Sequence, residues 1–325
     1  MRTHKLMAAI AIPMASAVFT VPAHAAQATY PDRPIRLVLG SAPGSGPDII
    51  ARVVSERLYG AWGQRIVVDA RPGVAGALSA EMVTRSAPDG YTWMMLTSQL
   101  LVASNVYTNL KFNLAKDFAS ISLIGTVPFV QVVNPQVPAK SIPELIELAK
   151  KKPGSLKYGS AGAGASEHLS GFLFTHLTHT EMLHVPYKGI AQALADTIGN
   201  EVQLSYPVLP AALPHIQSGR VRALGVTSRS RSKVLPDLPS ISEAVPGYEM
   251  LGWYSLVAPT GTPNEVLAKA SAEVAKAVKE PEFGEKLKGL GLELVGSTRT
   301  ELDAFRRDQT KKIGEIVKAS GVDLK

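Results

Sequence analysis

The chain has 325 residues, of which 46% are hydrophobic, and it contains no cysteine. This length is enough for two ordinary domains or one large one. The lack of cysteine excludes disulfides, cysteine nucleophiles and iron–sulfur clusters. The formal net charge is +7, but the basic residues are scattered and aromatic residues make up only 6%, so we expect no nucleic acid as a partner.

The first 25 residues have the features of a secretory signal peptide in the usual order. Arg2 and Lys5 form a short positive start, residues 6–21 are mostly apolar, and Ala23-His24-Ala25 is a small-residue cleavage pattern. The alternative, an uncleaved membrane anchor, needs about 20 clean apolar residues. We therefore expect cleavage near Ala25 and a periplasmic protein.

The next segments alternate between strand and helix patterns. Short apolar runs bounded by turn residues predict strands, and apolar residues at helical spacing predict helices. In chain order, we predict a strand at 35–39, a helix at 47–62, a strand at 66–68, a helix at 76–85 and a strand at 92–96.

The alternation continues to residue 226. A long, β-branched apolar run predicts one strand at 123–133, and Ser141 with Glu144 predicts the capped start of a helix that ends at residue 152. The elements that follow are strands at 156–159, 182–185, 202–205 and 221–226, and helices at 166–177, 190–198 and 209–217. Such alternation predicts an α/β fold whose mostly parallel strands are covered by helices.

The C-terminal part is predicted to be mainly helical. Thr262 with Glu265, and Thr298 with Glu301, have the spacing of capping boxes and predict helices at 263–279 and 299–319, with a short strand at 292–295 between them. The strands are too many for one small sheet, so we expect two lobes. A ligand would then lie between the lobes, at the carboxyl ends of the strands.

Two glycine-rich loops each join a predicted strand to a predicted helix. They span residues 40–48 and 159–166, and Ser166 is expected to cap the helix after the second loop. Glycines let a ligand approach the backbone, and the amides at a helix start favour an anion. Either loop alone is equally consistent with a plain turn. Together they predict a two-sided clamp for a carboxylate that needs no metal and no cofactor.

The sequence contains no recognisable catalytic constellation. His176 and His179 lie three apart, but without the spacing of a zinc motif they favour surface histidines. Ser230 and Lys233 match S-x-x-K without its partner motifs, and no G-x-S-x-G elbow is present. We expect no catalytic residue, no metal site and no cofactor. A secreted, hydrolase-like enzyme on a two-lobed scaffold is the alternative.

Short segments along the whole mature chain carry a resemblance to a known family. They include Tyr30-Pro31-Asp32-Arg33-Pro34, Asp48-Ile49-Ile50-Ala51-Arg52, Arg71-Pro72-Gly73, Ala87-Pro88-Asp89-Gly90-Tyr91, His184-Val185-Pro186-Tyr187-Lys188-Gly189, Leu235-Pro236-Asp237-Leu238-Pro239 and Ala258-Pro259-Thr260-Gly261-Thr262-Pro263. In these segments the chain resembles the Bug-type solute receptors of the tripartite tricarboxylate transporter family.

The resemblance implies a type II periplasmic-binding-protein fold, with two α/β lobes, a hinge and an interlobe cleft that closes on the ligand. It implies a signal peptide at 1–25, lobe one formed by residues 26–127 and 253–325, and lobe two formed by residues 128–252. Such receptors bind small organic anions and deliver them to membrane transporter subunits. We expect a monomer, and a sensor that serves a signalling partner is a second possible role.

The resemblance also implies which residues bind the ligand. The family's first loop usually has an aromatic residue and a proline that this chain lacks. Many relatives also carry an Asp-Asn pair, which suits an amino group, just before the position of Leu209-Pro210, where this chain has Ser205-Tyr206-Pro207-Val208. We therefore predict a non-amino carboxylate, either aromatic or dicarboxylic, with Tyr206 as an aromatic wall. The predicted ligand-binding residues are Ser41, Ala42, Pro43, Gly44, Ser45, Thr97, Ser98, Ser160, Gly164, Ala165, Ser166 and Tyr206.

Overall fold

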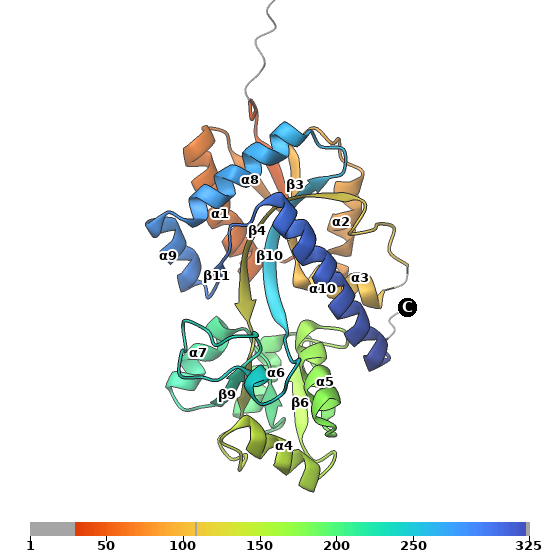
Figure 1. The fold of residues 1–325 in the computed structure, drawn as a ribbon, viewed down its shortest axis with the longest axis vertical. Coiled ribbons are helices and arrows are strands. Elements are labelled where there is room, and N and C mark those ends of the chain that lie inside the picture. Colours follow the sequence, from red (N-terminus) through yellow and green to blue (C-terminus); the bar gives the residue numbers. More distant parts are fainter. Residues whose placement is uncertain (1–29, 108, 323–325) are drawn as a thin grey trace, which may run out of the picture.

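The structure, a computed structural model, describes residues 30–107 and 109–322. Two lobes follow one another along the long axis of the molecule, and each is built on its own sheet covered by helices (Figure 1). The predicted two-lobed α/β fold is thus confirmed. Within the described residues, no helix is both long and apolar enough to cross a membrane.

Lobe one contains a mixed sheet of strand order β11-β4-β10-β3-β1-β2. Strand β1 pairs in parallel with β2 and β3, whereas β10 runs antiparallel to both β3 and β4. The strands are β1 (Ile35–Leu39), β2 (Ile66–Ala70), β3 (Thr92–Thr97), β4 (Phe118–Pro128), β10 (Leu251–Pro259) and β11 (Glu293–Leu294). The helices are α1 (Gly46–Trp62), α2 (Ala77–Thr84), α3 (Ser98–Val106), α8 (Asn264–Val278), α9 (Pro281–Gly289) and α10 (Arg299–Ser320).

Lobe two contains a second sheet of strand order β7-β6-β8-β5-β9. Strand β6 is parallel to β7 and β8, and β5 is antiparallel to β8 and β9. The strands are β5 (Val130–Val133), β6 (Lys157–Ser160), β7 (Leu183–Pro186), β8 (Leu204–Ser205) and β9 (Arg222–Val226). The helices are α4 (Ile142–Lys151), α5 (Ser166–Thr178), α6 (Ile190–Ile198) and α7 (Leu209–Gln217).

Strands β4 and β10 lead from lobe one toward lobe two (Figure 1). Their antiparallel ladder ends at the pair Pro128 and Leu251. The prediction of one strand at 123–133 is therefore wrong, because β4 ends at Pro128 and β5 begins at Val130 in the other sheet. A proline lacks the N–H that a ladder needs, so Pro128 marks the end of the pairing.

The predicted helix caps have mixed outcomes. Thr298 and Glu301 form a complete capping box at the start of α10, and the Ser141 side chain accepts the amide of Glu144 as predicted. The box predicted at Thr262 is wrong, since its hydroxyl donates to the carbonyl of Pro259 and α8 begins two residues later.

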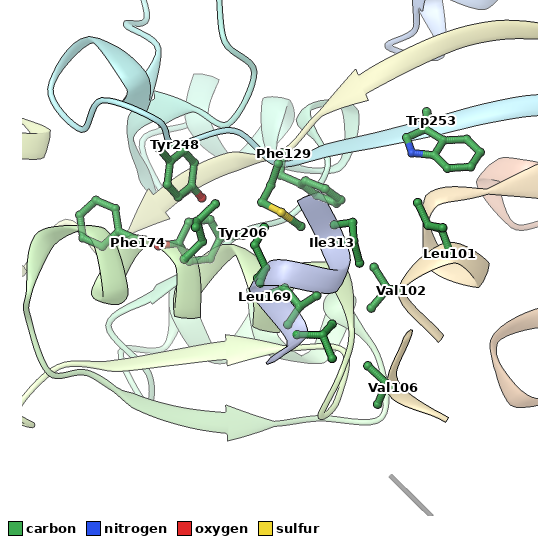
Figure 2. Close-up of a cluster of buried hydrophobic side chains, with 14 of the residues drawn as sticks. Leu101, Val102, Val106, Phe129, Leu169, Phe174, Tyr206, Tyr248, Trp253 and Ile313 are labelled. Carbon is green, nitrogen blue, oxygen red and sulfur yellow. The ribbon is translucent and has the colours of Figure 1, made fainter. Parts of the chain in front are cut away.

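A cluster of buried apolar side chains joins the two lobes along one side. Figure 2 shows Leu101 and Val102 of α3 and Ile313 of α10, all from lobe one, near Leu169 of α5 in lobe two. Each of these four side chains is at most 5% exposed. Buried apolar surface stabilises by about 25 cal/mol per Å². This cluster of side chains therefore holds α5 against α3 and α10.

Candidate functional site

A pocket of about 140 Å³ lies between the lobes. Thr97, Ser98 and Tyr254 of lobe one and Ser166 and Glu167 of lobe two are part of its lining. Val127 of β4 and Gly252 of β10, the two strands that lead from lobe to lobe, are also in the wall. The pocket therefore lies where the sequence predicts a ligand, at the junction of the two sheets.

Four helices of the described residues begin at this pocket. Pro47 is in the first turn of α1 and Ser98 is the first residue of α3, both in lobe one. Ser166 is the first residue of α5 and Val208 is the N-cap of α7, both in lobe two. The start of a helix presents unpaired amides and a partial positive charge of roughly half a unit. Their convergence makes the pocket favourable for an anion.

The two glycine-rich loops share one turn geometry. Gly44 and Gly164 both have a left-handed backbone, with φ of 77° and 73°. The next residues, Ser45 and Ala165, are the N-caps of α1 and α5, and each donates its amide to the carbonyl three residues earlier at 3.2 Å. The prediction that the loops have the same design is therefore confirmed. The prediction that Ser166 caps its helix is wrong, because Ala165 holds that place.

Each loop is fastened by a side chain of the helix that follows it. The Gly44 amide donates to a carboxylate oxygen of Asp48 at 2.9 Å, and the Gly164 amide donates to Nδ1 of His168 at 3.0 Å. The hydrogen bond from Arg52 lowers the pKa of Asp48, and burial lowers the pKa of His168. Asp48 is thus charged and His168 neutral at pH 7, the forms that can accept these amides. The two glycine amides are satisfied inside their loops.

A histidine pair supports the second loop. The rings of His168 and His184 are stacked with centroids 3.9 Å apart, and Nε2 of His184 lies 2.6 Å from Oγ of Ser160. Burial, followed by the neighbouring His168, lowers the pKa of His184 to about 4. Ser160 Oγ also accepts the amide of Gly162. Ser160 is completely buried, so its role in the structure is to hold this loop.

The structure corrects the predicted role of Tyr206. This side chain is completely buried in lobe two, next to Phe174 and Tyr248 (Figure 2). Its hydroxyl accepts a hydrogen bond from the side-chain amide of Gln131 at 2.7 Å. Because the ring packs into the core below the pocket wall, Tyr206 offers no aromatic surface to a ligand.

The predicted site residues are only partly brought together. Thr97, Ser98 and Ser166 line the pocket, whereas Ser41–Ser45, Gly164 and Ala165 lie in the loops beside it. Thr97 also caps α3 by accepting the amide of Leu100. The prediction missed pocket residues that lie at the starts of helices or along the strands that lead from lobe to lobe, namely Pro47, Gln99, Val127, Phe129, Glu167, Val208, Gly252 and Tyr254.

A larger cavity of about 540 Å³ lies on lobe one, beside α10. Its lining includes Leu101, Trp253 and three basic residues, Arg306, Arg307 and Lys311. The guanidinium of Arg306 donates to the carbonyls of Phe118 and Leu114 and so is already satisfied, while Arg307 and Lys311 are exposed on α10. No helix begins there. The interlobe pocket is therefore the better candidate for an anion. Within the described residues, no group of three or more His, Asp or Glu side chains is arranged to hold a metal ion.

Two α/β lobes that meet at an anion-favouring pocket have the architecture of a solute-binding protein of type II fold. The sequence model described as the tripartite tricarboxylate transporter family receptor matches residues 50–322. The chain belongs to that family.

Individual relatives support the same assignment. Protein BugT of Bordetella pertussis is 30% identical over 328 residues and covers 100% of both chains. Rpa4515 of R. palustris with adipate superposes with a TM-score of 0.80 at 32% identity, covering 90% of this chain and 99% of that one. MatC of Rhodopseudomonas palustris with bound malate has a TM-score of 0.75 at 26% identity, covering 89% and 100%. The predicted resemblance is confirmed, and the family and its solved members are solute-binding proteins, not enzymes.

Proposed function

We propose that the protein captures a small dicarboxylate in the interlobe pocket and delivers it to membrane transporter subunits. The convergence of four helix starts, two from each lobe, carries this proposal because it supplies positive potential from both sides. Adipate and malate, the ligands named for two relatives, are dicarboxylates. The buried position of Tyr206 removes the reason to expect an aromatic ligand.

We propose that the predicted site residues have two different roles. Thr97, Ser98 and Ser166 contact the ligand, while the two glycine-rich loops hold the starts of α1 and α5 in place. Lobe one comprises residues 26–127 and 253–325, lobe two comprises residues 128–252, and the lobes close on the ligand about β4 and β10. The signal peptide lies outside the described residues, and we propose its removal near Ala25. A monomer suffices for this function, and a sensor role would use the same closure.

Replacing Ser98 with aspartate tests the pocket directly. An aspartate at the first position of α3 suits the helix start, so the fold should be retained. Its charge would occupy the place of the ligand carboxylate. We expect titration calorimetry to show the affinity for adipate or malate reduced by at least about 100-fold, or about 2.7 kcal/mol.

The matched control is Asn264→Asp, which places the same charge at the exposed first residue of α8. This variant should bind like the unmodified protein. If Ser98→Asp bound adipate or malate as tightly as the unmodified protein, the ligand would not bind in the proposed pocket. Recovery of the unchanged ligand after incubation distinguishes a receptor from an enzyme.

Closure can be tested where the lobes touch beside the pocket. Gly291 of lobe one has a φ of 79°, and a Cβ added there would lie 2.0 Å from Cγ of Pro210 in lobe two. Gly291→Ala should therefore disfavour this arrangement of the lobes and weaken ligand affinity about tenfold, or about 1.4 kcal/mol.

Two further variants separate the collision from the strained backbone. Pro210→Ala in the same chain should restore part of the lost affinity, because it removes the atoms that collide. Gly289→Ala, where a Cβ meets nothing within 4 Å, should have no effect on binding. An unchanged affinity in Gly291→Ala would show that closure does not use this contact.

A further inference from the structure

Glu167 places an unpaired carboxyl group in the interlobe pocket. It is the second residue of α5, and it lines the pocket from lobe two in the position that Pro47 holds in the equivalent turn of lobe one. Its side chain is partly buried. Among the described residues, no other residue donates a hydrogen bond to this carboxyl group, and no lysine, arginine or histidine forms an ion pair with it. A carboxylate in that position opposes an anionic ligand.

The surroundings of Glu167 favour its neutral form. Burial raises its pKa to about 7, against a smaller lowering by its own backbone amide. Tyr254, on β10 across the pocket, is neutral because burial, followed by the charge of Glu167, raises its pKa to about 12. Asp48 of α1 is paired with Arg52, and His168 of α5 accepts the Gly164 amide. The residues of α3, α7 and β4 that line the pocket contribute no titratable side chain.

A carboxylate ligand and an ionised Glu167 would repel one another at close range, and two carboxyl groups in one site relieve this by sharing a proton. A protonated carboxyl is a hydrogen-bond donor, which the ionised form is not. We propose that Glu167 is protonated in the ligand complex and donates a hydrogen bond to a carboxylate oxygen of the ligand. Capture of the ligand then takes up one proton from solvent. This inference rests on the proposed function and adds that proton uptake accompanies ligand binding.

The pH dependence follows from which state holds the proton. The complex keeps the proton, while the empty pocket loses it as the pH rises through about 7. Between pH 6.5 and 8.5, affinity should therefore change little up to about pH 7 and fall about tenfold for each pH unit above it. His168 and His184 have lowered pKa values and stay neutral over this range, so they do not produce such a slope.

Titration calorimetry with adipate, malate and aspartate as probes tests the proposal at pH 6.5, 7.5 and 8.5. Each titration is run in two buffers of different ionisation enthalpy, which gives the number of protons taken up. The proteins are the unmodified chain, Glu167→Gln and Glu265→Gln. Glutamine keeps a hydrogen-bond donor at position 167 without titrating. Glu265 is the exposed second residue of α8 and is the matched control.

For adipate or malate, we expect proton uptake that approaches one at pH 8.5 in the unmodified protein and in Glu265→Gln. In Glu167→Gln we expect no uptake and an affinity that is independent of pH. Binding without proton uptake, or a pH slope retained in Glu167→Gln, would overturn the inference and leave the proposed function standing. Aspartate binding that strengthens with pH and is lost in Glu167→Gln would also overturn it, because an ionised Glu167 would then pair with the ammonium group. No binding of adipate or malate by any of the proteins would contradict the proposed function itself, and the inference with it.

Discussion

Replacing Trp93 with alanine is expected to lower the free energy of unfolding by about 3 to 5 kcal/mol. Trp93 lies on β3 in the middle of the lobe-one sheet and is completely buried. Its ring makes an edge-to-face contact with Trp62 of α1, with centroids 5.9 Å apart. Alanine would leave a cavity among Ile35, Leu37 and Met95, which belong to the same buried cluster.

Urea unfolding followed by circular dichroism measures this loss. The slope of the free energy of unfolding against urea concentration should be the same as in the unmodified protein. The control is Tyr59→Ala, which removes an aromatic ring that is 47% exposed on α1. That change should alter stability by at most about 0.5 kcal/mol. If the two variants unfolded at the same urea concentration, Trp93 would not be part of a packed core.

Replacing Gly40 with alanine is expected to cost about 3 kcal/mol, at the upper end of the usual range for overpacking. A Cβ at this position would lie 2.2 Å from Cα of Gly76. The colliding atom belongs to the backbone, so no change of side-chain rotamer can relieve the contact. Since Gly40 is the first residue of the first glycine-rich loop, the strain would also displace that loop, and carboxylate affinity should fall together with stability.

Gly60→Ala is the matched control for this substitution. Gly60 is exposed inside α1, and a Cβ there meets nothing within 4 Å. Alanine is favoured over glycine in a helix interior, so this variant should gain about 0.5 to 1 kcal/mol. Thermal or urea unfolding of both variants under one condition checks the pair. A Gly40→Ala protein as stable as Gly60→Ala would show that the two backbones can separate freely.

Helices and strands whose apolar residues recur at a clear spacing were predictable from the sequence. Elements that depend on contacts between distant parts of the chain were not. The strand at 35–39 and the helix at 47–62 agree with β1 and α1 to within one residue. Helix α3 was missed because it is buried on most sides and so lacks an amphipathic pattern. The division between β4 and β5 depends on which sheet each strand joins, and Phe129 between them bridges to Val208, far along the chain.

The candidate site was predictable at the level of loops but not of side chains. Glycines between a strand and a helix marked both loops, because an anion-favouring turn needs that backbone. Tyr206 was placed wrongly since its partner Gln131 lies 75 residues away in the sequence and draws the hydroxyl into the core. Glu167 was missed because a glutamate in a first helical turn is ordinary, and only the facing lobe gives it a pocket.

We expect the contact of α5 with α3 and α10 to determine where a ligand can enter. Pulling these helices apart would expose Val102, Leu169 and Ile313 to water. This exposure would cost about 25 cal/mol of free energy for each Å² of apolar surface. Widening the opposite edge, where Gly291 meets Pro210, leaves those side chains covered. The closure proposed about β4 and β10 is therefore expected to open the edge that lies away from α10. We expect the ligand to enter at that edge, on the side of the molecule where α9 and α7 lie (Figure 1).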